Sequence, residues 1–132
     1  ILVGGLGHPK GLEAGNFVRP TVFVNVTNDM RIAQEEIFGP VICMLTYKTD
    51  EEAIQIANDT VYGLQAFVSS TNIERANRIA RQIDAGRVLV NFLGTDPLAP
   101  FGGFKQSGIG REYGVFGFEQ YLEPKALLGD IQ

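Results

Sequence analysis

The chain has 132 residues, a formal net charge of −4, 45% apolar residues and 20% charged residues, which is typical of a soluble globular protein, and its length predicts a single domain. The negative charge argues against nonspecific nucleic-acid binding, which depends on Lys and Arg, and no apolar run approaches the ~20 residues that span a bilayer. Cys43 is the single cysteine, so no intrachain disulfide can form, and this fits a reducing compartment such as the cytoplasm.

The first part of the chain predicts loop, strand, helix and strand in that order. Residues 1–5 are apolar and end in glycines, and the Gly-rich residues that follow predict a loop. The β-branched and aromatic residues 21–26 predict a strand, and residues 28–36 predict a short helix. Residues 40–48 form a nearly continuous apolar run, which favours a strand buried on both faces, as in parallel sheets. The chain begins in a strand-like pattern without Met, so we expect a fragment of a longer protein.

Two capping boxes predict the next two helices. Thr49-x-x-Glu52 opens a helix over residues 50–59, and Thr71-x-x-Glu74 opens a second helix after a short strand at 66–70. In the second helix one face is apolar and is made of Ile73, Ala76, Ile79, Ala80 and Ile83. Gly86 leads into a predicted strand at 86–91.

The last part of the chain changes character. Residues 93–117 are rich in Gly and Pro, residues 115–122 predict a helix, and residues 123–128 predict a terminal strand. Strands that alternate with helices of about ten residues are typical of the α/β class. We therefore predict an α/β fold with a largely parallel sheet and flanking helices.

The usual catalytic and metal-binding side chains are scarce. Cys43 lies within a predicted buried strand, where a free cysteine is most often an inert core residue. His8 has no Cys or His partner at the spacing of metal ligands, so we predict a surface residue and no metal site. The glycines of residues 5–11 and 103–110 fit neither a dinucleotide fingerprint nor a P-loop.

The run PFGGFKQSGIGRE, residues 100–112, has two open interpretations. It fits a tight turn pinned by an ion pair among its charged residues, which are Lys105, Arg111 and Glu112. It equally fits a loop that lines a pocket, in which Gly102 and Gly103 admit a ligand and Phe101 supplies an apolar wall.

The run EEIFGP, residues 35–40, places two carboxylates and a phenyl ring before a strand. In the simplest interpretation one acid charges a helix end and the other faces water, although an acid at a helix carboxyl end costs a few tenths of a kcal/mol. If residues 36–38 are extended, Glu36 and Phe38 point to the same side. A carboxylate beside a ring can accept hydrogen bonds from a sugar diol while the ring packs on the ribose, which suits a nucleotide.

Six runs together resemble the aldehyde dehydrogenase superfamily, in family order and over nearly the whole chain. They are PTVFVNV, EEIFGPV, EEAIQIANDTVYGL, ERANRIARQIDAGRVLVN, PFGGFKQSGIGREYG and EPKALL. Their pattern is similar to the NAD-dependent, betaine-aldehyde-type branch. The resemblance implies oxidation of an aldehyde to a carboxylic acid with NAD or NADP, through a cysteine thiolate that attacks the carbonyl and a glutamate that activates water.

The resemblance also implies roles for individual residues. Glu36 is expected to bond the hydroxyls of the nicotinamide ribose, Phe38 to pack beside that ribose, and Leu64 to approach the nicotinamide. Phe92 and Phe101 are expected to line the aldehyde tunnel. Arg111 and Glu112 are expected to hold their loop rather than to do chemistry.

The family's catalytic cysteine, base glutamate and oxyanion asparagine lie upstream of the matched part, so we expect no catalytic residue in this chain and no activity from the chain alone. Residues 1–122 are expected to be the carboxyl-terminal part of the catalytic domain, and residues 123–132 the start of an oligomerisation strand. The expected partners are an aldehyde and further copies of the protein, with no nucleic acid and no membrane. The alternative is a noncatalytic binding or oligomerisation module that kept the scaffold.

Overall fold

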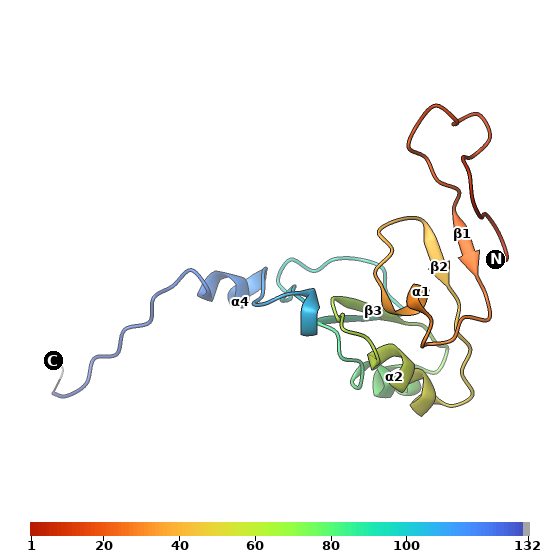
Figure 1. The fold of residues 1–132 in the computed structure, drawn as a ribbon. Coiled ribbons are helices and arrows are strands. Elements are labelled where there is room, and N and C mark those ends of the chain that lie inside the picture. Colours follow the sequence, from red (N-terminus) through yellow and green to blue (C-terminus); the bar gives the residue numbers. More distant parts are fainter. Residues whose placement is uncertain (131–132) are drawn as a thin grey trace. The chain divides into compact units, whose positions relative to one another are not determined.

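The computed structural model describes residues 1–130, which fall into two compact units (Figure 1). The first unit is Ile1–Asp59 and the second is Thr60–Gln132. The single domain expected from length stays a prediction, and each unit is described by itself. Each unit has a small core: Thr21 and Val26 are buried in the first, and Ala76 and Leu89 in the second. With so few buried side chains, most of the chain's apolar surface is not covered by its own residues.

The first unit contains one parallel strand pair and two helices. Its elements are β1 (Thr21–Phe23), α1 (Arg31–Gln34), β2 (Val41–Cys43) and α2 (Asp50–Asn58). β1 and β2 run parallel with Thr21 opposite Val41 and Phe23 opposite Cys43. Figure 1 shows the two strands side by side. Val3 forms an antiparallel bridge with Val22, so the residues before β1 extend this pair.

The strands of this unit are shorter than the sequence predicts. β2 ends at Cys43, whereas the apolar run continues to residue 48. Ile42 at its centre is 61% exposed, so the prediction of a strand buried on both faces is wrong for this chain. The physical reason is that an apolar pattern favours a strand only where neighbours pair with its edge and cover its faces. Among the described residues, β2 pairs with β1 alone.

The two helices of the first unit begin differently. Thr49 Oγ1 accepts a hydrogen bond from Glu52 N at 3.2 Å, so Thr49 caps α2 as predicted. The Glu52 carboxylate reaches back one residue further than a capping box requires and accepts from Lys48 N at 2.7 Å. α1 is a single turn that begins after Met30 and has no side-chain cap.

The second unit contains another parallel strand pair with a helix against it. Its elements are β3 (Gln65–Val68), α3 (Ile73–Ala80), β4 (Arg87–Val90), the 3₁₀ helix η1 (Lys105–Ser107) and α4 (Gly114–Glu119). Gln65 lies opposite Arg87 and Val68 opposite Val90. α3 packs against both strands through Ala76, which has no exposed surface. The predicted α/β class with parallel strands and helices is confirmed.

The start of α3 differs from the prediction by one residue. Asn72 is the cap, because its Oδ1 accepts from Arg75 N at 2.9 Å. The capping box expected at Thr71 is therefore wrong. Asn and Thr both serve as caps, and Asn is the stronger of the two. Ile83 lies beyond the end of α3, so it does not share the helical face.

The carboxyl end does not form the predicted terminal strand in the described residues. Residues 123–128 have neither helix nor strand, and residues 131–132 of the expected oligomerisation segment lie outside the described part of the chain. A strand requires hydrogen bonds from a neighbouring edge, and this segment pairs with no described residue of the chain. Within residues 1–130 no helix is long and apolar enough to cross a membrane.

Candidate functional site

The two adjacent carboxylates of the first unit have different surroundings. Glu35 follows α1, and its Oε1 accepts a hydrogen bond from Arg31 Nε at 2.7 Å. That hydrogen bond from the Arg31 guanidinium is the main cause that lowers the pKa of the Glu35 carboxyl below its ordinary value. Within residues 1–130 no hydrogen bond or ion pair engages the Glu36 carboxylate, which is exposed. The Glu35 carboxylate is thus engaged by Arg31, whereas the Glu36 carboxylate is accessible to a ligand.

The backbone turns outward directly after α1. Glu35 already has an extended conformation, with φ −95° and ψ 145°, and residues 36–38 belong to no helix. Gly39 N donates to Ile37 O at 2.8 Å, which closes a three-residue turn with Phe38 at its centre. The Phe38 side chain is 97% exposed. An aromatic ring that the chain itself leaves uncovered can pack against a ligand or another part of a larger protein.

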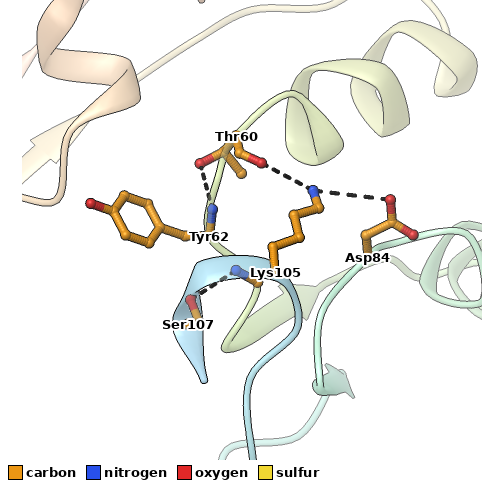
Figure 2. Close-up of polar contacts among 6 residues, drawn as sticks. Thr60, Tyr62, Asp84, Lys105 and Ser107 are labelled. Atoms are coloured by element: carbon orange, nitrogen blue, oxygen red, sulfur yellow. Dashed lines mark hydrogen bonds and ion pairs between the residues drawn. The ribbon is translucent and has the colours of Figure 1, made fainter. Parts of the chain in front are cut away.

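Leu64 stands directly before β3 in a segment that is firmly held. Its carbonyl oxygen accepts from Arg87 N at 3.2 Å, and the preceding Gly63 N donates to Ser107 Oγ at 2.9 Å. Figure 2 shows this contact beside a second one, in which Lys105 Nζ donates to Thr60 O at 3.1 Å. The Leu64 side chain is 42% exposed. Its backbone is therefore fixed while its side chain remains accessible.

Phe92 lies beyond the other end of the same strand pair. With Phe67, Leu89 and Leu93 it lines an open hollow of 370 Å³, in which Ser69 and Asn91 supply the polar groups. The Asn91 side chain bonds the backbone of Ser70 on both sides, accepting from its N at 2.9 Å and donating to its O at 2.7 Å. These bonds fix the turn that presents Phe92, whose side chain is 55% exposed.

Phe101 lies among aromatic and cationic side chains. Its ring stacks on Tyr113 with 5.9 Å between the centroids, and the Arg87 guanidinium lies 4.7 Å above it. Since Arg87 also pairs with the backbone of Leu64, these residues gather at the amino ends of β3 and β4. Phe92 follows the carboxyl ends, about 13 Å of strand away at 3.3 Å per residue. The structure therefore brings Leu64 and Phe101 toward one end and leaves Phe92 at the other.

Residues 100–112 form a loop held by backbone bonds. Arg111 Nη1 donates to Gly110 O at 2.6 Å and to Gly103 O at 3.2 Å, and Phe101 and Glu112 pair through their backbones. Arg111 and Glu112 thus hold the loop, as expected. The Arg111 guanidinium pins the turn through carbonyl oxygens rather than through an ion pair.

The contacts of Cys43 and His8, the other two candidates from the sequence, are to backbone carbonyl oxygens. Cys43 is half-buried at the end of β2, and its Sγ lies 3.5 Å from Ile32 O. His8 is exposed, with Nδ1 2.9 Å from Phe17 O. In the described part of the chain, no group of three or more His, Cys, Asp and Glu side chains is placed to hold a metal ion.

Sequence reasoning missed the functional interest of Lys105, Ser107 and Arg87. Lys105 and Ser107 stand in a Gly-rich loop with no helical or strand periodicity, so no pattern indicates what they contact. Their partners Thr60 and Gly63 are about 45 residues away along the chain. The one sequence signal is the glycine pair at 102–103, which indicates a close backbone approach.

Comparisons with known proteins place these features in a family. The model of the aldehyde dehydrogenase family matches residues 1–127. The chain is 54% identical over 129 residues to a 3-succinoylsemialdehyde-pyridine dehydrogenase from a Pseudomonas species, a match that covers 98% of this chain and 27% of that protein. The chain therefore spans about a quarter of the length of the relatives it matches.

Two solved structures are similar throughout most of the chain. One is a mutant of aldehyde dehydrogenase C from Pseudomonas syringae with NAD⁺ and octanal, with a TM-score of 0.89 and 56% identity over 92% of this chain and 25% of that one. The other is a betaine aldehyde dehydrogenase from Staphylococcus aureus with NAD⁺, with a TM-score of 0.87 and 48% identity over 92% of this chain and 24% of that one.

Proposed function

From the premise that the chain belongs to the aldehyde dehydrogenase family, we propose that it is part of a longer protein that oxidises an aldehyde to a carboxylic acid with NAD or NADP. The cofactor supplies the acceptor for the hydride. The nucleophilic cysteine, the base glutamate and the oxyanion asparagine come from other parts of that protein, since the one cysteine here is half-buried at the end of β2. The isolated chain is then inactive.

Glu36 and Phe38 form the cofactor-facing part of the proposal. The observation that carries it is a contrast: Glu35 is paired with Arg31, whereas Glu36 has no partner within residues 1–130. An ionised carboxylate accepts hydrogen bonds from two adjacent hydroxyls, and such charge-assisted bonds are stronger than neutral ones. Phe38 offers an exposed ring two residues later. These features fit the hydroxyls and the apolar face of the nicotinamide ribose.

Leu64 belongs to the cofactor-facing part of the proposal, and Phe92 and Phe101 form the substrate-facing part. Leu64 combines a fixed backbone with an accessible apolar side chain, which suits contact with the flat nicotinamide ring. Phe92 lines an apolar hollow with a polar edge, and such hollows suit the chain of an aldehyde. Phe101 supplies a second aromatic wall at the opposite end of the strand pair.

Assembly and location complete the proposal. We place the protein in the cytoplasm as a homo-oligomer, and residues 123–132 begin the segment that joins subunits. The alternative function, a noncatalytic binding or oligomerisation module, is favoured by one observation, the large exposed apolar side chains, which include Leu93, Ile109 and Leu128. A catalytic domain that has lost its covering residues exposes the same surface.

The test is production of NADH or NADPH from an aldehyde, measured for the longer protein and for the 132-residue chain in parallel. We expect turnover from the longer protein and none from the chain. An inactive longer protein, assayed with aliphatic and aromatic aldehydes and both cofactors, would favour the noncatalytic module. Turnover by the chain alone would overturn the claim that the nucleophile lies elsewhere.

A further inference from the structure

Five hydrogen bonds hold the segment before β3, four of them from the loop that contains η1 and one from Gly86, directly before β4. Three join backbone atoms or a hydroxyl to the Gly63 peptide: Gly63 N donates to Ser107 Oγ at 2.9 Å, and Gly63 O accepts from Phe104 N at 2.8 Å and Gly86 N at 2.9 Å. Both the N–H and the carbonyl oxygen of Gly63 are therefore hydrogen-bonded. Because Leu64 follows directly, any movement of Gly63 moves Leu64.

The other two bonds hold the start of the same segment. Gln106 N donates to Val61 O at 2.9 Å, and Lys105 Nζ donates to Thr60 O at 3.1 Å. The Lys105 ammonium also lies 4.0 Å from Asp84 Oδ2, so a single side chain joins residue 60 to the turn before β4 (Figure 2). The Asp84 side chain is 57% exposed, so solvent screens this ion pair, and the hydrogen bond to Thr60 O is the closer of the two contacts.

The backbone of Lys105 has an unusual conformation. Its φ is +52°, in the left-handed region that residues with a Cβ rarely adopt. Such conformations persist where the surrounding structure determines them, and they cluster at functional sites. Here the Lys105 side chain reaches Thr60 O, and Ser107, two residues later, accepts a hydrogen bond from Gly63 N.

The close approach of the segments leaves no room for adjustment. A Cβ added to Gly63 would overlap the carbonyl oxygen of Asp84, and a Cβ on Gly103 would overlap the backbone of Ser107. The Cβ on Gly63 would also lie 3.1 Å from Phe104 Cβ, so the loop at 104–107 lies directly against residue 63. We expect a change in this loop to reach residues 60–64.

Resting on the proposed function, we infer that Lys105 and Ser107 are positioning residues that hold residues 60–64 and thereby set the place of Leu64 against the nicotinamide. Neither side chain needs to touch the cofactor. If this role is correct, removing a contact between the loop and residues 60–64 weakens binding of the cofactor and leaves binding of the aldehyde largely unchanged.

The kinetic test uses the longer protein with the substitutions Ser107→Ala and Leu64→Ala, alone and together. We expect Ser107→Ala to raise KM for the cofactor roughly threefold to tenfold, the loss that one hydrogen bond typically produces, while KM for the aldehyde changes less than about twofold. The double variant should match Leu64→Ala alone, because Ser107 acts through Leu64. An unchanged cofactor KM, or full additivity of the two substitutions, would overturn the inference.

A second variant and a matched control separate positioning from general stability. Lys105→Met keeps the aliphatic stem but removes the bonds to Thr60 and Asp84, and it should raise the cofactor KM in the same direction. Thr49→Ala also removes a hydroxyl that accepts from a backbone N–H, but in α2. It should lower the melting temperature and leave the cofactor KM unchanged. An equal rise in KM from Thr49→Ala would contradict a specific role for Ser107.

Amide hydrogen exchange of residues 60–64 gives a readout without activity. Exchange in this segment should be faster in Ser107→Ala than in the wild type and unchanged in Thr49→Ala. Equal exchange in all three proteins would show that Ser107 does not hold the segment. A wild-type protein with no aldehyde oxidation would overturn the proposed function, whereas an active wild type with unaltered Ser107→Ala kinetics would overturn the positioning role alone.

Discussion

Arg31 and Glu35 face each other across one turn of α1, with 2.7 Å between Arg31 Nε and Glu35 Oε1. The Arg31 side chain also has a raised pKa, chiefly because of its hydrogen bond to Glu35. The pair explains why two adjacent acids differ. Glu35 forms an ion pair with Arg31 at the end of α1. No cationic side chain among the described residues pairs with Glu36.

The pair should make a small pH-dependent contribution to the stability of the folded protein. The pKa of Glu35 is lowered by folding, so its contribution is present above the unfolded value near 4.5 and is lost as the pH falls through the lower folded value. Unfolding by urea at a series of pH values between about 6 and 3 measures it. Glu35→Gln should make the decline on acidification shallower. A decline identical to the wild type would contradict the pairing.

The cap of α3 gives a sharper test of local structure. Asn72→Ala should lower the free energy of unfolding by about 1 kcal/mol, because Arg75 N loses its acceptor. Thr71→Ala, one residue earlier, is the matched control and should change it by less than about 0.5 kcal/mol. If Thr71→Ala destabilises the protein more than Asn72→Ala, the cap is Thr71, as the sequence pattern predicts, and not Asn72.

The close approach at the start of β4 should tolerate no side chain. A Cβ on Gly86 would overlap the carbonyl oxygen of Gly102, which cannot rotate away. Gly86→Ala should therefore lower the free energy of unfolding by about 1–3 kcal/mol. Gly39→Ala is the control, since its Cβ would meet no atom within 4 Å. Equal melting temperatures for the two variants would contradict the close packing of the loop at 100–112 on β4.

The isolated chain should associate in solution. Its uncovered apolar side chains and open strand edges favour contact between copies. Light scattering over a range of concentrations should show an average mass that rises above the 14.4 kDa of one chain. A constant monomer mass at high concentration would contradict this expectation.

The sequence predicted features that depend on residues close together in the chain better than features that depend on distant segments. The cap at Thr49, the entry of β4 after Gly86 and the α/β class depend on neighbours in the chain and are confirmed. Strand lengths were overestimated, because apolar alternation does not show whether a partner edge is present. Thr71 and Asn72 are adjacent and both belong to residue types that cap helices, so only the observed hydrogen bond identifies the cap.

The candidate site was predictable where its residues are contiguous. EEIFGP contains its carboxylates and ring within six residues, and its pattern is recognisable without a structure. The contact of Lys105 with Thr60 joins positions 45 residues apart and depends on a left-handed backbone at a residue that is not glycine. No local pattern encodes that contact, so the role of Lys105 and Ser107 emerges only from the packed loop.

The most direct test of the account is KM for the cofactor in the longer protein after Glu36→Gln, with Glu35→Gln as the matched control. Gln keeps the size of Glu but removes the charge, so Glu36→Gln should raise the cofactor KM roughly tenfold to a hundredfold, the effect of losing a charged hydrogen bond. Glu35→Gln should leave it within about twofold, since the Glu35 carboxylate is already engaged by Arg31. An unchanged cofactor KM in Glu36→Gln, or an equal rise in both variants, would contradict the assignment of Glu36 as the ribose ligand.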